Sequence, residues 1–414
     1  MNSSQPKIAI VGGGPGGLTL GVLLHQAGVP ATIYELRQRP TEDELDLPSG
    51  SLDLHEESGL KAIQACGLSE PFAACTSDCS EAWKIINAAG VALYTSEGGS
   101  DRPEIARHQL MRLLLSKLPE DKVKWGCKIT SAERVAKEKT KLGFGEDAEE
   151  VFDVVIGADG SWSRIRPLVS DARPQYTGLQ NLTLTISNIT ERYPQLSQFC
   201  GDGTMCVLED GNAIIMGQRG VKHSQRLYIT IASAHEDFAE REKVHSLDAD
   251  ALYDYLAATD TLYKTFADLP KKLIKAACDD STAPVNRGAS TRYDLRPFYK
   301  LPIGHRWKHV PGVTVIGDAA HLMTPYAGEG VNLAMRDALD VAAAVAEAWQ
   351  INHADVAAFQ SALAPLLEAV EADMQSRAEE KAGETESNRQ LIFSENAAEK
   401  FASVMRGHTG APEP

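Results

Sequence analysis

The sequence has no excess of basic residues. Its 41 lysines and arginines are outnumbered by 57 aspartates and glutamates, which gives a formal net charge of -16. Nucleic-acid binding depends on clustered lysine and arginine side chains, and anionic membrane surfaces attract basic segments. The composition therefore argues against both kinds of partner, although acidity alone does not indicate a substrate.

Paired cysteines and long apolar runs are also missing. The seven cysteines are scattered without a CxxC pair, so neither a disulfide framework nor a metal site is expected. No stretch approaches the roughly 18 apolar residues that a membrane span needs. The apolar run near the N-terminus breaks at Gly12 and is typical of a strand rather than a signal peptide. We therefore expect a soluble, cytoplasmic protein without a membrane partner.

The length of 414 residues suits two intertwined domains rather than one compact core. The chain opens with a β-branched run at residues 8–11, a helical pattern at 18–27 and a second strand pattern at 32–36. This order predicts a βαβ unit, which requires parallel strands and a right-handed crossover.

Further helices and buried strands follow along the chain. Residues 107–118 predict a helix that Pro119 ends, and residues 329–349 predict a long alanine-rich helix. Residues 151–156 and 313–316 read as buried strands. Residues 351–414 read as helical and then polar, with a disordered end.

The middle of the chain has a different pattern. Apolar and polar residues alternate at 182–186 and 227–231, and Asp210-Gly211 separates strand-like runs at 205–208 and 213–216. Alternation with turn residues of this kind predicts hairpins in a one-faced antiparallel sheet. We expect that sheet to be inserted between parts of the nucleotide-binding domain.

A glycine-rich motif joins the first strand to the first helix. Gly12, Gly14 and Gly17 form GxGxxG, which allows a tight turn, close approach of a pyrophosphate and tight helix–strand packing. The helix N-terminus offers free amides to the phosphates. Glu35, at the end of the second strand, is placed to accept hydrogen bonds from ribose hydroxyls. Together these residues predict a dinucleotide site.

A second motif reads Val-Val-Ile-Gly-Ala-Asp-Gly at residues 154–160, with Arg164 and Arg166 after it. Asp159 and the glycines would bring backbone close to a cofactor, and the arginines would neutralise phosphate. An Asp-Gly pair can equally be an ordinary turn, and both interpretations stay open.

A third motif runs from residue 315 to residue 321 and continues through 325–330. Asp318 ends a strand, where it can accept a hydrogen bond from the ribityl chain of a flavin. The turn that follows places the amides of residues 328–332, which include Gly328, Gly330, Val331 and Asn332, at a helix N-terminus. Such donors would stabilise the negative charge of a reduced flavin.

With these motifs in order, the chain resembles the class A FAD-dependent monooxygenases of the para-hydroxybenzoate hydroxylase fold. The resemblance runs from Lys7 to about Trp349. Within that group the chain is similar to the TetX-type tetracycline-inactivating monooxygenases and their fungal relatives. The closer similarity rests on Ser51-Leu-Asp-Leu-His55, Pro103-Glu-Ile-Ala-Arg107, residues 317–323 and residues 326–332.

The resemblance implies roles at the matching positions. Glu35 would hold the adenosine ribose, Arg107 the ribityl or phosphate region of FAD, and Asp318 the ribityl-pyrophosphate. Pro325 and the loop after it would lie beside the isoalloxazine ring and the substrate. His55 would lie near both, as an acid, an orienting group or a structural histidine. For His321 a packed structural role is favoured.

The resemblance also implies where substrate binds. Thr183, Thr204 and Tyr228 align with the positions at which TetX-type enzymes hold the polar ring of tetracycline, but they differ in residue type. A site built on buried hydrogen bonds discriminates strongly, so tetracycline is not the expected substrate. A small aromatic, indolic or polyketide-like molecule fits better.

The implied reaction uses FAD with NADPH or NADH as co-substrate. NAD(P)H would reduce the flavin, dioxygen would add to form the C4a-hydroperoxide, and the distal oxygen would pass to an electron-rich carbon. Only one GxGxxG occurs, so NAD(P)H would bind transiently. Two alternatives stay open: a flavin oxidase or dehydrogenase on the same fold, and a non-catalytic flavin-binding sensor. The oligomeric state is not predicted.

The predicted fold class is α/β, a Rossmann-like FAD-binding domain with an inserted antiparallel-sheet substrate domain and a C-terminal helix. The predicted FAD-binding parts are residues 1–72, 106–172 and 291–350. The predicted substrate parts are residues 73–105 and 173–290, and residues 351–414 form a C-terminal helical segment and tail.

Overall fold

A computed structural model describes residues 5–76, 80–99, 102–145, 148–209, 213–258, 261–281 and 293–409. The Asp210-Gly211 turn and the polar end beyond residue 409, both subjects of sequence predictions, lie outside the described residues. No helix in the described part of the chain is long and apolar enough to span a membrane.

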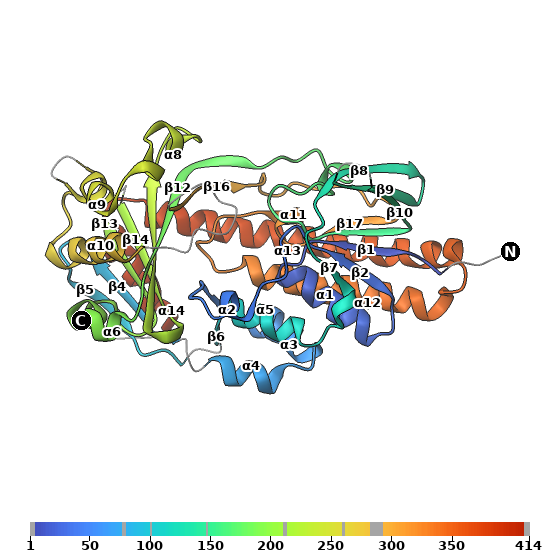
Figure 1. Cartoon of the computed structure of the whole chain (residues 1–414), viewed down its shortest axis with the longest axis horizontal. Helices are drawn as coiled ribbons and strands as arrows, with labels where there is room; N and C mark the ends of the chain where they lie inside the picture. The colour runs from blue at the N-terminus through green and yellow to red at the C-terminus, as the bar shows by residue number, and fades with distance from the viewer. Residues whose placement is uncertain are drawn as a thin grey trace.

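A parallel sheet forms one half of the molecule (Figure 1). Its order is β17-β11-β1-β2-β7. The strands are β1 (Ile8–Val11), β2 (Ala31–Tyr34), β7 (Val123–Lys124), β11 (Val154–Gly157) and β17 (Val313–Val315). β1, β11 and β17 are buried along their whole length, as expected of parallel strands covered on both faces.

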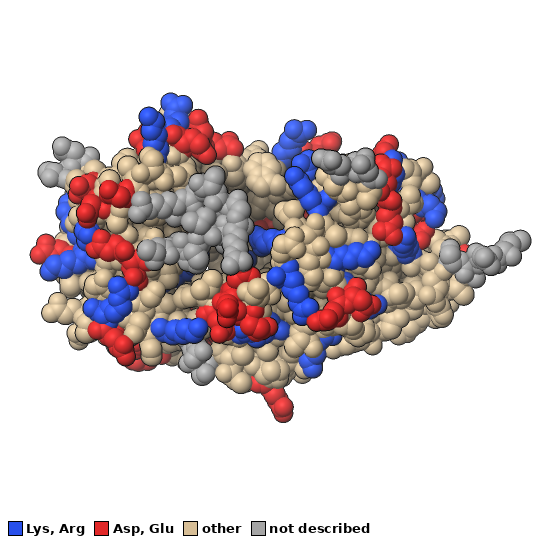
Figure 2. All heavy atoms as spheres, viewed as in Figure 1, with Lys and Arg blue, Asp and Glu red and all other residues tan. Residues whose placement is uncertain are grey.

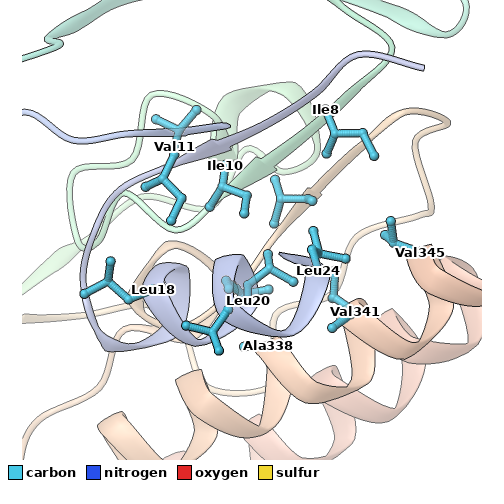
Figure 3. Close-up of a cluster of buried hydrophobic side chains, with 14 of the residues drawn as sticks. Ile8, Ile10, Val11, Leu18, Leu20, Leu24, Ala338, Val341 and Val345 are labelled. Atoms are coloured by element: carbon cyan, nitrogen blue, oxygen red, sulfur yellow. The ribbon is translucent and has the colours of Figure 1, made fainter. Parts of the chain in front are cut away.

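Two helices pack together against this sheet. The buried side chains of α1 (Pro15–Gln26) and α12 (Gly330–Asn352) meet those of β1 (Figure 3). Leu18, Leu20 and Leu24 of α1 are fully buried between β1 and α12. The expected βαβ unit is therefore present, and α12 completes its core from more than 300 residues away in the sequence.

A seven-stranded sheet forms the other half, with the order β16-β12-β15-β14-β13-β4-β5. The strands are β4 (Trp83–Asn87), β5 (Ala92–Ser96), β12 (Gln175–Ile186), β13 (Thr204–Glu209), β14 (Ala213–Gly220), β15 (Ser224–Ala232) and β16 (Asp294–Lys300). β13 and β14 pair as the predicted hairpin. β4 and β13 are parallel, so the sheet is mixed rather than purely antiparallel.

The seven-stranded sheet is covered on both faces, which corrects the one-faced prediction. On the outer face an apolar core joins the sheet to five helices. They are α6 (Ile189–Arg192), α7 (Pro194–Cys200), α8 (Phe238–Arg241), α9 (Ala249–Ala257) and α10 (Asp268–Asp280). On the inner face a separate cluster joins the sheet to Tyr326 and to α14 (Ala397–Thr409).

The C-terminal region links the two halves. α13 (Val356–Ile392) packs on α12, and its Gln360 donates to the backbone oxygen of Asp153 beside the parallel sheet. Its last residue, Ile392, belongs to the inner-face cluster of the other sheet. The predicted helical segment is thus two helices that tie the sheets together (Figure 1).

The remaining elements are short. A three-stranded sheet contains β8 (Ile129–Ala136), β9 (Lys139–Phe144) and β10 (Ala148–Phe152), and β3 (Ser51–Asp53) pairs with β6 (Glu104–Ala106). The short helices are α2 (Glu42–Leu45), α3 (Lys61–Ala65), α4 (Ser69–Cys75), α5 (Arg107–Leu115) and α11 (Asp318–His321).

Two sequence predictions about strands need correction. The strand expected at 151–156 is two strands, because the Asp153 carboxylate accepts from the Lys7 amide at 2.8 Å and from Lys139 at 2.9 Å. The chain passes there from the three-stranded sheet to the parallel sheet. β16 pairs with β12, so the seven-stranded sheet also takes residues beyond position 290. The α/β fold class is confirmed, and the division into domains stays a prediction.

Candidate active site

The three motif glycines are required for different reasons. A Cβ on Gly12 would lie 2.2 Å from the Ala158 oxygen, and one on Gly17 would lie 2.0 Å from the Gly12 oxygen. Gly12 also has a φ of 109°, which L-residues rarely adopt. A Cβ on Gly14 would meet no described atom within 4 Å. Gly12 and Gly17 are thus needed for packing, whereas Gly14 keeps an open approach to the turn.

Glu35 lies beside that turn, directly after β2. Its carboxylate accepts hydrogen bonds from the amides of Gly13 at 2.6 Å and Arg37 at 2.8 Å. Each carboxylate oxygen has a second lone pair for a further donor. The open Gly14 turn, the N-terminus of α1 and this carboxylate fit the ADP half of FAD.

Asp159 and Arg166 make local contacts. The Asp159 carboxylate accepts from the Ser163 hydroxyl at 2.5 Å and from the Arg164 amide at 2.7 Å. Arg166 is buried and donates to the backbone oxygens of Ala319 and Asp318. Arg166 therefore joins this turn to the Asp318 motif instead of neutralising a phosphate, and a cofactor contact from Asp159 stays a prediction.

Asp318 begins α11, at the carboxyl end of the parallel strand β17. Its side chain has solvent-accessible surface. The protein atoms around it nevertheless reduce its hydration and raise its pKa, while the charges of His321, Arg107 and Arg166 oppose that rise. The Arg107 charge also acts on the Tyr228 hydroxyl. Arg107 is thus close enough to both Asp318 and Tyr228 for its charge to act on each of them.

The start of α12 offers amide donors. The first N–H groups of a helix have no acceptor within the helix, and α12 begins at Gly330 without an acidic residue in its first turn. Val331 and Asn332 follow in that turn. The Gly328 amide, in contrast, donates to the Pro325 oxygen at 3.1 Å. Of the donors predicted at 328–332, the Gly328 amide is thus already paired, and the role of the others stays a prediction.

Asn332 also has a structural function that its sequence motif did not indicate. Its side chain is fully buried, and its Oδ1 accepts from the His55 amide at 2.9 Å. Its Nδ2 donates to the Asp53 oxygen at 2.9 Å. The asparagine thereby joins the end of β3 to the first turn of α12.

His55 lies beneath the same loop with only 1% of its surface exposed. Its Nε2 is 3.1 Å from Asp53 Oδ2, and its Nδ1 is 3.5 Å from Glu329 Oε2. Burial opposes protonation, but Asp53 and Glu329 outweigh it and raise the pKa of His55 to about 9. Glu329 in turn accepts from Lys381 of α13 at 2.6 Å.

His321 is also buried between carboxylates. Its Nε2 lies 2.6 Å from Asp337 Oδ2 of α12, and that same oxygen accepts from the Gly317 amide. Burial lowers the pKa of His321, but the Asp337 charge outweighs it and raises the pKa overall. This geometry supports the packed role favoured from the sequence.

The residues aligned with the substrate positions share one face of the seven-stranded sheet. Thr183 and Tyr228 are register partners in β12 and β15. Thr204 pairs with Gln218, which pairs with Arg226, two residues before Tyr228. Because side chains alternate along a strand, all three predicted residues point to the inner face. Thr183 and Thr204 are buried, and Pro325 is exposed.

Tyr228 reaches the FAD-binding half through a short network. Its hydroxyl donates to Gln218 Oε1 at 3.0 Å, and the same oxygen accepts from the Ser51 amide at 3.2 Å. A Cβ on Gly50 would lie only 2.6 Å from the Tyr228 hydroxyl. The seven-stranded sheet and the β3 segment are thus in direct contact at this point.

Arg226 and Glu104 are polar residues of this region to which the sequence analysis assigned no role, although Glu104 lies within the motif at residues 103–107. Arg226 lies 5.8 Å from the Tyr228 ring centroid, and its Nε has no hydrogen-bond partner among the described residues. Glu104 is buried, and its Oε2 accepts from the Ser51 hydroxyl at 2.5 Å. Burial and the charges of Asp53 and Glu81 raise the pKa of Glu104 to about 7, although Ser51 and Thr204 hydrogen bonds oppose this.

The pKa of Glu104 predicts a pH-dependent stability. A carboxyl that is harder to ionise when folded stabilises the protein fully below its unfolded pKa of about 4.5, and that contribution is lost as pH rises through about 7. We compare the free energy of unfolding of Glu104→Gln with that of the parent. We expect this difference to shift in favour of the variant by up to about 3 kcal/mol between pH 5 and pH 8. Urea unfolding at both pH values measures this.

The exposed Glu240 gives a matched control, because it lies on the outer side of the sheet. Glu240→Gln is expected to change stability by less than about 0.5 kcal/mol at both pH values. An equal response of the two variants to pH would contradict the burial of an ionisable Glu104.

Comparison with known proteins identifies the family of this chain. Residues 5–362 match the model of the FAD binding domain family. Monooxygenase penA of Penicillium thymicola is 34% identical over 97% of this chain and 99% of its own. The chain belongs to the FAD binding domain family. Its class, an FAD-dependent monooxygenase that acts on an organic substrate with NAD(P)H as co-substrate, is thereby confirmed.

Solved structures of this family show the same fold. HpxO of Klebsiella pneumoniae complexed with FAD and uric acid has a TM-score of 0.70 and 20% identity, over 97% of this chain and 93% of that chain. The tetracycline destructase Tet(55) has a TM-score of 0.61 and 19% identity, over 95% and 97% of the two chains. The resemblance inferred from the motifs is confirmed.

Proposed function

We propose that this monooxygenase hydroxylates an aromatic, indolic or polyketide-like molecule held between the inner face of the seven-stranded sheet and the flavin. The observation that carries the proposal is the shared face of Thr183, Thr204 and Tyr228. That face adjoins the β3 segment through Gln218 and Ser51. The opposite face is filled by apolar side chains from five helices, so it leaves no comparable polar surface.

FAD fits the residues of the other half, and we propose roles for them. Gly12, Gly14, Gly17 and Glu35 would hold its ADP part, and Arg107 and Asp318 its ribityl and phosphate region. The amides that begin α12, from Gly330 to Asn332, would face the ring. When bound and reduced by NAD(P)H, FAD supplies the oxygen activation that side chains lack.

The chain's own contribution is then to orient the substrate and to exclude water. Tyr228 and the half-buried guanidinium of Arg226 beside it would bind a polar group of the substrate. His55 is enclosed by Asp53 and Glu329, which supports an orienting role beneath the loop rather than direct proton donation. Asp159 would contact the cofactor while keeping its hydrogen bonds with Ser163 and Arg164.

The expected location and partners follow from the charge and cysteine pattern. We propose a cytoplasmic protein without nucleic-acid or membrane partners. On the face shown in Figure 2, acidic and basic side chains of the described residues are interspersed, and they form no continuous basic surface there. Interspersed charge does not suit binding to a polyanion.

Oxygen incorporation tests the proposed function. The FAD-loaded protein is incubated with NADPH or NADH, ¹⁸O₂ and a panel of aromatic, indolic and polyketide-like compounds. At least one compound is expected to accelerate NAD(P)H oxidation and to gain one labelled oxygen atom. Tyr228→Phe is expected to raise KM for it about 2- to 10-fold, the effect of one lost hydrogen bond.

The control is Tyr255→Phe, whose ring packs on Phe238 against the outer face. It is expected to leave KM unchanged. An unlabelled oxidised product with stoichiometric hydrogen peroxide would establish an oxidase or dehydrogenase instead. Bound FAD without any compound-stimulated NAD(P)H oxidation would establish a sensor.

A further inference from the structure

Three aromatic rings meet at the point where the loop before α12 touches the inner face of the seven-stranded sheet. The Tyr326 ring is 6.4 Å from Phe298 and 6.0 Å from Phe393 between centroids. The interplanar angles are 88° and 86°. These edge-to-face pairs fall within the preferred range for aromatic contacts. We call Phe298, Tyr326 and Phe393 the aromatic corner.

The aromatic corner is assembled from three distant parts of the chain. Phe298 belongs to β16, Tyr326 to the loop after α11, and Phe393 directly follows α13. The end of α13 holds the loop, since Asn388 donates to the Tyr326 oxygen at 3.0 Å and Thr385 to the Thr324 oxygen at 2.9 Å. The end of α13 therefore sets the position of two of the three rings.

The aromatic corner adjoins the proposed substrate face. Tyr326 packs in one cluster with Cys206 and Ile214 of the inner face, and Ile214 is the register partner of Thr230 in β15. Thr230 is two residues from Tyr228 on the same side of β15, a distance of about 6.6 Å along a strand. Pro325, which the resemblance places beside the substrate, directly precedes Tyr326 in the loop.

Part of the aromatic corner is exposed, and the charged groups near it are paired. Tyr326 is buried, but Phe298, Phe393 and the neighbouring Met216 are only half-buried. The Arg389 charge acts on Tyr326, and this arginine is paired, because Glu386 binds both Lys300 and Arg389 at 2.6 to 2.8 Å. The aromatic corner thus offers ring faces and edges without a charge to recognise.

We propose that the aromatic corner binds an aryl group of the substrate, while Tyr228 and Arg226 bind its polar end. This inference rests on the proposed function. It narrows the substrate to molecules in which an aryl ring and a polar group are separated by about 6.6 Å, the distance between Thr230 and Tyr228 along β15. Ring pairs in perpendicular contact favour a further ring over a saturated group of equal size. The end of α13 thereby takes part in selecting the substrate.

Binding of a matched pair of probes tests this proposal. 2-Naphthol and trans-decahydro-2-naphthol share a skeleton and a hydroxyl group, and only the first has aryl rings. Each is titrated into the FAD-loaded protein, and Kd is taken from the change in the flavin absorption spectrum. We expect 2-naphthol to bind about 10-fold more tightly, and Phe393→Leu or Phe298→Leu to reduce that preference about 3- to 10-fold.

Two further variants separate ring recognition from general damage. Phe393→Tyr keeps the ring and is expected to keep the preference. Phe199→Leu removes a buried ring from the core on the outer face, and it is also expected to keep the preference. FAD content is measured for every variant, so that a misfolded protein is recognised. If Phe393→Leu is misfolded, Phe298→Leu takes its place in the comparison.

The outcomes distinguish this proposal from the proposed function. Equal binding of the two probes by the parent protein, no spectral change with either, or an unchanged preference in both leucine variants would overturn the aromatic corner as the aryl site. Because these titrations need no turnover, they are independent of the ¹⁸O₂ experiment. A selective aromatic corner in a protein that labels no product would leave this inference standing and refute the proposed function.

Discussion

Replacing Gly17 by alanine is expected to disrupt the first βαβ unit, whereas replacing Gly14 by valine is expected to preserve the fold and abolish FAD binding. The Gly17 methyl group would lie 2.0 Å from the Gly12 oxygen, an overlap that only movement of the backbone can relieve. Overpacking of this kind costs about 1–3 kcal/mol or more. At Gly14 no described atom lies within 4 Å, and φ is -74°, so valine is accommodated in the apoprotein.

The loss at Gly14 would come from the ligand alone. A branched side chain there would occupy the space through which the pyrophosphate approaches the turn. We expect the affinity of Gly14→Val for FAD to fall at least about 100-fold, or roughly 2.7 kcal/mol. Thermal unfolding of the apoproteins and FAD titration by fluorescence quenching measure the two effects separately. Normal FAD binding by Gly14→Val would show that the turn does not face the cofactor.

Replacing His55 by glutamine is expected to weaken the fold and to uncouple NAD(P)H oxidation from product formation. The raised pKa keeps the buried imidazole protonated between Asp53 and Glu329 at neutral pH. A histidine of this kind stabilises the folded state fully below its unfolded pKa of about 6.5, and the contribution is lost as pH rises through about 9. The free energy of unfolding of the parent should therefore exceed that of His55→Gln by up to about 3 kcal/mol at pH 6. This difference should shrink toward pH 10.

The functional effect follows from the position of His55 beneath the loop before α12. Two carboxylates without their cation repel each other, and both contact the segment that would lie beside the flavin ring. With the substrate that the ¹⁸O₂ screen identifies, we expect hydrogen peroxide to increase at the expense of product while NAD(P)H oxidation continues. Stability from urea unfolding at several pH values is compared with peroxide and product yields. A variant that oxidises NAD(P)H normally but yields neither peroxide nor product would show that His55 is an essential acid.

The sequence by itself determined the nucleotide-binding half and the class of the enzyme. Gly12, Gly17 and Glu35 lie within 24 consecutive residues. The contacts of Gly17 with Gly12 and of Glu35 with Gly13 are made inside one βαβ unit, although Gly12 also packs against Ala158. Local patterns of this kind are readable because backbone conformation and hydrogen bonding act over short chain distances. The hairpin of β13 and β14 was predictable for the same reason. The covered inner face was not, because α14 and Tyr326 reach it from the end of the chain.

Only the tertiary structure decided how the polar residues of the site are used. The Asn332 side chain bonds the backbone of His55 across 277 positions, although its motif predicted only an amide donor. Glu104 is an unremarkable residue in the sequence, and its pKa reaches about 7 because β3 and β6 enclose it beside Asp53. The aromatic corner joins residues 298, 326 and 393. Burial and pairing of this kind arise from packing between distant segments, so residue type and local spacing do not encode them.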